Sequence, residues 1–171
     1  RKNIGKRTIF NVIGPLVNPL HPKFQIIGTS SEDLHDPISK VLQKKGIEHG
    51  IVVTSNDGID EFSITDTSKV TEIKGGKIKK WTFDPESYGI NCGNLAEIQC
   101  NTGEEAYLLG VDVLNGKRCA AAEMVAINSG VALYMLNLVE TINDGIIKSK
   151  SILNSGRTLL LLNRFATLSK S

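Results

Sequence analysis

The sequence of 171 residues has few cysteines and little net charge. Its three cysteines form no C-x-x-C pair, and the odd number argues against a disulfide framework, so we expect reduced thiols and a cytoplasmic protein. The formal net charge is +2, from 20 basic and 18 acidic residues. This balance gives no electrostatic reason to expect a nucleic acid or a membrane surface as a partner.

The chain also lacks a long uninterrupted apolar run. Residues 120–139 are rich in Ala, Val, Ile, Leu and Met, but Glu123, Asn128 and Asn137 interrupt them. A membrane-spanning helix needs about 20 predominantly apolar residues in a row. The segment therefore predicts a helix that is buried in a protein core.

Two short apolar runs, residues 24–29 and 51–54, predict buried strands. Between them, Ile38, Val41 and Leu42 have the i, i+3, i+4 spacing of an amphipathic helix. A strand, a helix and a second strand in this order predict a right-handed crossover between parallel strands.

The bounds of this helix are clear only at its end, where Gly46 predicts a stop. Its start has two alternatives. Ser30 with Asp33 could form a capping box, whereas Asp36 could cap a helix that has Pro37 in its first position.

Further along the chain, Gly75-Gly76 lies between two β-prone runs within residues 70–83, which predicts a hairpin. We therefore expect an α/β fold with a mostly parallel central sheet and a β-hairpin, flanked by helices. Beyond Pro85 the apolar pattern is helical and predicts four helices, near residues 103–115, 118–139, 142–153 and 156–168.

One acidic turn is a candidate for chemistry. Asp60 and Glu61 follow the strand at 51–54, and Gly58 permits a tight turn before them. Ligands of open α/β sheets bind at the carboxyl ends of parallel strands, and carboxylate oxygens are ligands that Mg²⁺ prefers. Spacing alone favours a solvated acidic loop over a metal site. We interpret Asp57 as a turn residue.

Other polar residues give weaker signals. The three histidines, His21, His35 and His49, share no metal-like spacing, and we expect them on the surface or in loops. The hairpin is flanked by lysines without clustered aromatic residues, which predicts a solvated sheet edge that discourages strand pairing. These lysines are Lys77, Lys79 and Lys80.

Two motifs in the chain resemble those of the anthranilate phosphoribosyltransferases. Residues 7–19 match the family signature R-T-x-F-N-x-x-G-P-L-x-N-P, and residues 58–63 look like the acidic metal-binding turn of the family. The first motif disfavours a pyrimidine nucleoside phosphorylase, which shares the general fold. The resemblance covers the whole chain but only about the C-terminal half of the family's length, without its G-T-G-G-D diphosphate loop. We therefore expect a fragment that is inactive alone.

The resemblance implies transfer of phosphoribosyl from phosphoribosyl pyrophosphate to anthranilate in tryptophan biosynthesis. It implies Mg²⁺ on Asp60 and Glu61, and a contact of Arg1 with the anthranilate carboxylate. It also implies the large α/β domain of a nucleoside phosphorylase/phosphoribosyltransferase-type fold at residues 21–171, with residues 1–20 as the remnant of a small helical domain and a hinge. The intact family member would be a homodimer, and we expect this piece to be a monomer.

Some positions depart from the family or allow two interpretations. Thr54 stands where the family usually has His, and residues 128–130 read Asn-Ser-Gly where it tends to have Asn-Ala-Ala. Arg1 is otherwise an exposed terminal residue. Arg7 is expected to be structural, and Asn11 is either a helix-packing residue or a neighbour of the substrate. The alternative function is that of a non-catalytic relative that binds nucleic acid.

Overall fold

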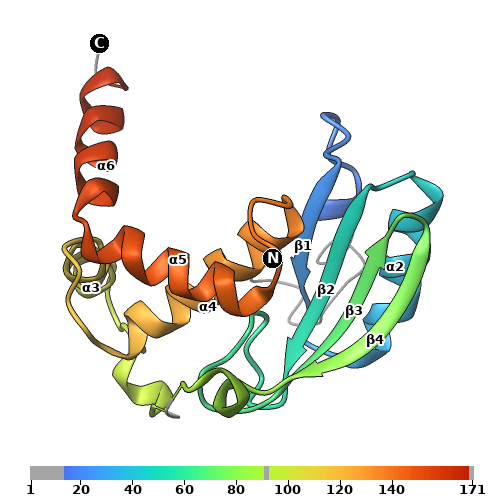
Figure 1. Cartoon of the computed structure of the whole chain (residues 1–171), viewed down its shortest axis with the longest axis horizontal. Helices are drawn as coiled ribbons and strands as arrows, with labels where there is room; N and C mark the ends of the chain where they lie inside the picture. The colour runs from blue at the N-terminus through green and yellow to red at the C-terminus, as the bar shows by residue number, and fades with distance from the viewer. Residues whose placement is uncertain (1–13, 91–92, 170–171) are drawn as a thin grey trace, which may run out of the picture. The chain divides into compact units, whose positions relative to one another are not determined.

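The computed structural model describes residues 14–90 and 93–169 (Figure 1). Arg1, Arg7 and Asn11 lie outside the described residues. The described chain divides into two compact units. The first contains residues up to 61 together with 68–83, and the second contains residues 62–67 and those from 84 onward.

The first unit is built on a sheet with the strand order β1-β2-β3-β4 (Figure 1). The strands are β1 Phe24–Gly28, β2 His49–Ser55, β3 Ser68–Lys74 and β4 Lys77–Phe83. The α/β class and the parallel pairing of β1 with β2 are confirmed. The expectation of a mostly parallel sheet is corrected, because β3 and β4 run antiparallel to their neighbours. The chain between β2 and β3 contains no crossover helix, so it returns in the opposite direction.

Helix α2, His35–Lys44, forms the crossover between β1 and β2. A short 3₁₀ helix, Glu32–Leu34, precedes it, and the side chain of Ser31 caps that turn by accepting from the Asp33 N–H. Neither of the two predicted starts is therefore correct. The cap is one residue beyond Ser30, and Pro37 is the third residue of α2 rather than the first.

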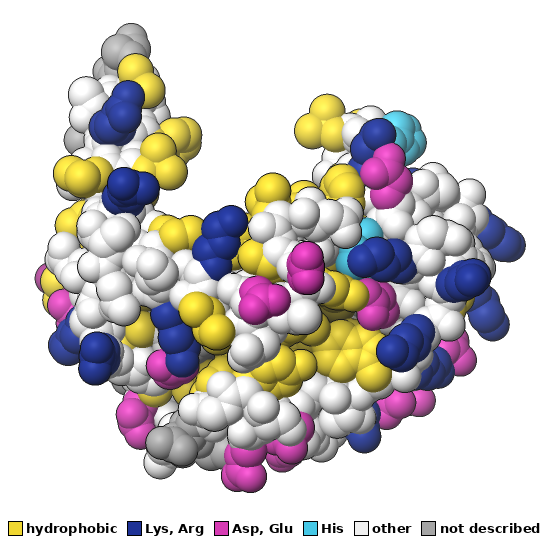
Figure 2. Space-filling view, in the orientation of Figure 1, with side chains coloured by type: hydrophobic (Ala, Val, Ile, Leu, Met, Phe, Trp, Pro, Cys, Tyr) yellow, Lys and Arg dark blue, Asp and Glu magenta, His cyan; other side chains and the backbone are white. Residues whose placement is uncertain are grey.

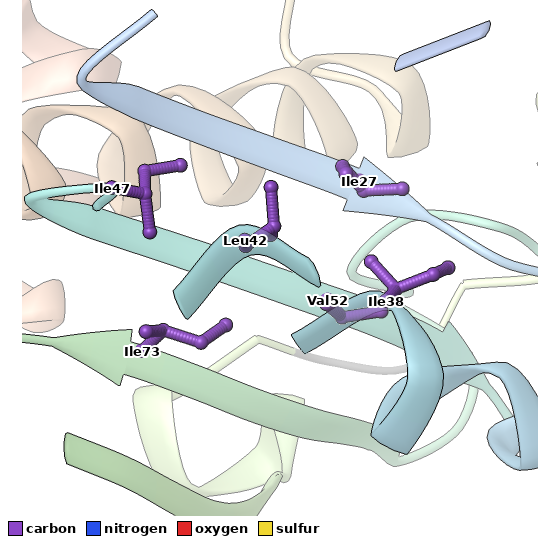
Figure 3. Packing of buried hydrophobic residues seen from close by; sticks show 6 residues of the cluster. All are labelled: Ile27, Ile38, Leu42, Ile47, Val52 and Ile73. Carbon is purple, nitrogen blue, oxygen red and sulfur yellow. The ribbon is translucent and has the colours of Figure 1, made fainter. Parts of the chain in front are cut away.

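The core of the first unit lies between α2 and the sheet. Ile38 and Leu42 extend from α2 toward the strands (Figure 3). Burial of each such side chain contributes about 1.5–3 kcal/mol to folding. The cluster consists of Ile27, Ile38, Leu42, Ile47, Val52 and Ile73.

The predicted hairpin between β3 and β4 is confirmed. Gly75 and Gly76 have φ values of 55° and 76°, which places both in the left-handed region that a two-residue type I′ turn requires. Lys74 pairs with Lys77 across this turn. Strand β4 is the predicted edge strand, and basic side chains gather on that side of the sheet with acidic ones among them (Figure 2).

The second unit is helical. All four predicted helices are confirmed, and among the described residues no helix is long and apolar enough to cross a membrane. Apolar side chains are exposed on the last helix (Figure 2), where Phe165 is an example. The helices are α3 Gly103–Leu114, α4 Ala120–Met135, α5 Ile142–Asn154 and α6 Arg157–Leu168.

Helix α4 is shorter than predicted, because Asn137 adopts a left-handed conformation that ends it. Asn137 has a φ of 53°, its N–H donates to Tyr134 O, and the N–H of Leu138 donates to Leu133 O. These two bonds form a Schellman motif with asparagine in the left-handed position. The predicted end at residue 139 is therefore corrected to Met135.

Helices α4 and α5 cross at two glycines. A Cβ added to Gly130 would lie 2.6 Å from the backbone N of Ile146, and one added to Gly145 would lie 2.3 Å from Gly130 O. The two helix backbones therefore touch directly, with no side chain between them at this point.

Candidate functional site

The acidic turn of the first unit begins where β2 ends. The Ser55 N–H donates to Ile59 O at 2.9 Å, and the Gly58 N–H donates to Ser55 O at 3.1 Å. Within the turn, the Ile59 N–H donates to Asp57 Oδ1 at 3.2 Å. Asp57 is therefore the turn residue that the sequence predicts, and its side chain helps to fix the loop that presents the next carboxylates.

The other end of the turn, at Asp60, packs against Gly28 at the end of strand β1. A Cβ added to Gly28 would stand only 1.7 Å from the backbone O of Asp60. Any side chain at this position would therefore displace the turn. Sequence analysis missed Gly28, because nothing in the sequence shows that a loop more than 30 residues away packs on it.

Asp60 and Glu61 are both exposed on this turn. They lie beside the carboxyl ends of the only parallel strand pair in the described sheet, as the sequence predicts for a ligand site. The described residues contain no cluster of three or more His, Cys, Asp or Glu side chains that could hold a metal. In the described part of the chain, the turn thus offers two adjacent carboxylates as possible metal ligands.

A buried histidine lies beside the same strand ends. His35, the first residue of α2, is 1% exposed, which corrects the expectation of a surface or loop position. Its Nε2 is 3.0 Å from Thr54 Oγ1, and its Nδ1 is 3.0 Å from Thr71 Oγ1. Burial, the largest cause, holds the pKa of His35 below its ordinary value of 6.5. The imidazole is therefore neutral at pH 7.

Thr54, the position where the family usually has His, links β2 to β1. Its hydroxyl donates to Thr29 O at 2.9 Å and also contacts Thr29 Oγ1. Thr29 in turn donates its backbone N–H to Val53 O at 2.8 Å. The departure at Thr54 is thus accommodated by hydrogen bonds to a histidine and a threonine that the sequence did not connect with it.

His49 is the second histidine that proves to be buried rather than exposed, at 2% exposure. Its Nε2 lies 2.7 Å from Glu72 Oε1, and Trp81 Nε1 donates to Glu72 Oε2 at 3.1 Å. The three side chains come from neighbouring strands and tie β2, β3 and β4 together. His21 is exposed, as expected.

In the second unit, Asn128 contacts a loop rather than only neighbouring helices. Its Oδ1 accepts from the Phe62 N–H at 3.1 Å, and its Nδ2 donates to Phe62 O at 3.0 Å. Gly130, two residues later, allows the close approach to α5 described above. At this departure from the family pattern, Gly130 therefore lies in the contact between two helices.

A parallel strand pair joined by a crossover helix, with an exposed acidic turn at its carboxyl end, places this chain among α/β domains. A family model described as glycosyl transferase family, a/b domain, matches residues 1–159. The chain belongs to this family.

Individual relatives carry a more specific name. An anthranilate phosphoribosyltransferase from Vesicomyosocius okutanii is 44% identical over 156 residues, which are 91% of this chain and 46% of the relative. One from Hydrogenovibrio crunogenus is 34% identical over 171 residues, which are 100% of this chain and 50% of the relative. The resemblance found in the sequence is confirmed, and the chain spans about half the length of the curated relatives it matches.

Solved structures agree with this result. An anthranilate phosphoribosyltransferase from Thermus thermophilus has a TM-score of 0.89 at 27% identity, covering 100% of this chain and 50% of that protein. One from Saccharomyces cerevisiae in complex with PRPP and Mg has a TM-score of 0.84 at 28% identity. The match covers 96% of this chain and 48% of that protein. The α/β fold class is confirmed by these neighbours.

Proposed function

We propose that this chain is part of an anthranilate phosphoribosyltransferase. With the rest of that enzyme, it would transfer phosphoribosyl from phosphoribosyl pyrophosphate to the amino group of anthranilate, releasing pyrophosphate. One observation carries the proposal. Asp60 and Glu61 are exposed at the carboxyl end of the parallel pair β1–β2, in a chain whose relatives bear this name.

This reaction places few covalent demands on a protein. Pyrophosphate leaves, the sugar carbon develops positive charge, and the weak amine attacks it. The protein must neutralise the leaving group and position the two substrates. An exposed acidic turn serves the first task by holding a cation on the diphosphate.

The residues present fit Mg²⁺ in this role. Mg²⁺ is usually held by one or two carboxylates and completes its octahedron with water and substrate phosphates. Asp60 and Glu61 provide those carboxylates, and their exposure leaves room for phosphate oxygens. When bound, the cation would neutralise charge that develops on the leaving diphosphate. The yeast neighbour has PRPP and Mg bound, which supports the proposal for this chain.

The experiment uses a full-length chimera, in which the part of the Hydrogenovibrio crunogenus relative that precedes the matched half is joined to this chain. We expect the chimera to form phosphoribosyl-anthranilate. In the double variant Asp60→Asn, Glu61→Gln, kcat/KM should fall by about 10²-fold or more, as when a charge that stabilises the transition state is lost.

The matched control is Glu104→Gln, because Glu104 is an exposed carboxylate in the first turn of α3. This variant should keep the activity of the unmodified chimera. A folded chimera that forms no product would contradict the proposed reaction. A double variant with unchanged kcat/KM at limiting Mg²⁺ would contradict the metal site.

We also assign the anthranilate carboxylate to Arg1, which lies outside the described residues. A guanidinium binds a carboxylate through two parallel hydrogen bonds and so orients a small planar acid. Arg1→Ala in the chimera should cost about 1.5–3 kcal/mol in the use of anthranilate, the value of a charge-assisted hydrogen bond. The effect on phosphoribosyl pyrophosphate should be smaller. Equal effects on both substrates would make Arg1 a structural residue.

The domain and assembly assignments are part of the same proposal. Residues 1–20 would belong to a small helical domain and its hinge, and residues 21–171 to the large α/β domain of a cytoplasmic homodimer. The 171-residue chain alone should be a monomer without transferase activity. Light scattering and an assay of the purified chain test both points. A tight dimer, or activity above a hundredth of that of the chimera, would overturn them.

A further inference from the structure

A chain of hydrogen bonds runs beneath the acidic turn of the first unit. It starts at the hydroxyl of Thr71 on β3, passes through both ring nitrogens of His35 on α2, and reaches the hydroxyl of Thr54 on β2. From there it continues to the backbone carbonyl of Thr29 at the end of β1. The buried imidazole therefore joins α2 directly to β2 and β3, and Thr54 extends the connection to the end of β1.

The direction of these bonds follows from the number of protons. One assignment satisfies all of these bonds: the Thr54 hydroxyl donates its single proton to Thr29 O and accepts a hydrogen bond from His35 Nε2–H. A neutral imidazole has one donor and one acceptor, so Nδ1 accepts from the Thr71 hydroxyl. The lowered pKa of His35 agrees with this neutral state.

The acidic turn is attached to the residues that this chain joins. Ser55, whose N–H and C=O both bond within the turn, directly follows Thr54. At the other end, the Asp60 carbonyl lies on Gly28, which directly precedes Thr29. A shift of the end of β2 relative to the end of β1 would therefore move the backbone that carries Asp60 and Glu61.

We infer that His35 is a positioning residue for the acidic pair. Through Thr54 it holds the carboxyl ends of β1 and β2 in register, and this register sets where Asp60 and Glu61 are presented. The inference rests on the proposed function, because the acidic pair needs a fixed position only if it binds a cation and a diphosphate. His35 itself need not contact either one.

The first test measures the turn in the 171-residue chain itself. Thr54→Val removes the hydroxyl while keeping the shape, and Thr54→Ser restores a hydroxyl. We expect amide hydrogen exchange at Ser55 and Gly58 to accelerate about tenfold in Thr54→Val, the effect of losing one or two net hydrogen bonds. His35→Gln should act in the same direction.

Two controls make this test specific. Thr54→Ser should exchange like the unmodified chain. Ser39→Ala removes another buried hydroxyl of α2, whose bond to Asp36 O at 3.1 Å stays within the helix, and it should leave the turn unchanged. Exchange at Val52, in the middle of β2, should be the same in every variant. Unchanged exchange at Ser55 and Gly58 in either Thr54→Val or His35→Gln would overturn the inference.

The second test asks whether the position of the turn matters for the cation. In the full-length chimera, Thr54→Val should raise the Mg²⁺ concentration for half-maximal rate about tenfold, and Thr54→Ser should restore it. A merely structural role would lower the amount of folded enzyme without changing this concentration. Faster exchange of the turn with an unchanged Mg²⁺ dependence would therefore overturn the inference and leave the proposed function standing. A folded but inactive unmodified chimera would overturn the proposed function instead, while the exchange data would still decide whether His35 fixes the turn.

Discussion

Asn128 holds both backbone polar groups of Phe62. Its Oδ1 accepts from the Phe62 N–H at 3.1 Å, and its Nδ2 donates to Phe62 O at 3.0 Å and to Met124 O at 3.0 Å. Phe62 is itself fully buried. The bonds thus satisfy backbone groups at a position where water has little access, and the cost of losing them can be measured.

We expect Asn128→Ala to lower the free energy of unfolding by about 2–6 kcal/mol, because two backbone groups of a buried residue lose their partner and each costs about 1–3 kcal/mol. Urea denaturation of the chain measures this change. Asn163→Ala, at an exposed position of α6, is the control and should change stability by less than about 0.5 kcal/mol. Similar values for the two variants would contradict the role of Asn128.

The contact between Gly28 and Asp60 gives a second prediction. In Gly28→Ala the new Cβ meets a backbone oxygen, which cannot rotate away as a side chain would. We expect a loss of stability of about 1–3 kcal/mol, typical of overpacking, and a lower kcat/KM of the full-length chimera for the Mg²⁺ complex of phosphoribosyl pyrophosphate.

The matched control for Gly28 is Gly110 in helix α3. A Cβ at Gly110 meets nothing within 4 Å, so Gly110→Ala should stabilise the helix by about 0.5–1 kcal/mol. If Gly28→Ala has the same stability and activity as Gly110→Ala, the turn does not pack on β1 as the structure shows.

The crossing of α4 and α5 gives a third prediction. Gly145→Ala would place its Cβ 2.3 Å from Gly130 O, so the two helices must move apart. Thermal unfolding should show a loss of about 1–3 kcal/mol or more, because the clash is with backbone on the partner helix. Ser129→Ala, at an exposed position of the partner helix α4, should be neutral or slightly stabilising. A neutral Gly145→Ala would contradict the close crossing.

The sequence predicted the local elements better than the contacts between them. Apolar runs, the Gly75-Gly76 turn and helical periodicity depend on residues that are close in sequence, and each of these predictions is confirmed. The antiparallel return of β3 was missed, because strand direction depends on how the chain between β2 and β3 is routed. That route has no local signal.

The candidate site divides in the same way. Asp57 and the acidic pair were found because their turn has a local pattern of glycine and carboxylates. His35 and Gly28 were missed, because each acts on a segment about 20 or more residues away. His35 looked like a surface residue because a single histidine near a helix start gives no sign of the two threonines that surround its ring.

The buried Glu72 gives a fourth prediction. Glu72→Ala removes the acceptor of Trp81 Nε1–H and the partner of His49 Nε2, so it should cost about 2–6 kcal/mol, because two groups lose a hydrogen-bond partner and each loss costs about 1–3 kcal/mol. Trp81→Phe is the comparison, because it removes the indole N–H donor itself and so leaves no unsatisfied donor at this position. Because Trp81 is partly exposed, its loss should cost clearly less. Equal losses in urea denaturation would contradict a specific role of the carboxylate.

The neutral state of His35 gives a prediction for pH. Burial lowers the pKa of His35 in the folded protein, whereas in the unfolded chain it is near 6.5. Between these two values the unfolded chain binds a proton that the folded protein does not, so stability falls as the pH falls. The stability that the neutral His35 ring contributes is fully present above the pKa of His35 in the unfolded chain. It is lost as the pH falls toward the pKa of His35 in the folded protein.

The charged groups around His35 do not reverse this sign. Glu32 and Asp36 raise its pKa and Lys80 lowers it, but burial is the largest cause. Asp36 is paired with Lys80 at 2.7 Å, which holds the pKa of Asp36 below its ordinary value of 3.8. Neither partner of this ion pair therefore changes its charge between pH 5 and 8, as the reference pKa values of about 4 and 10 also indicate.

The experiment compares unfolding free energies in urea at pH 5, 6, 7 and 8 for the unmodified chain, His35→Gln and His21→Gln. One group can change stability by at most about 1.4 kcal/mol per pH unit. The difference between the first two curves should therefore decrease as the pH falls from 7 to 5, by at most about 3 kcal/mol over these two units. His21 is exposed, and His21→Gln should follow the unmodified chain. If the curve of His35→Gln also runs parallel to that of the unmodified chain, His35 is not held neutral by its burial between the strands and α2.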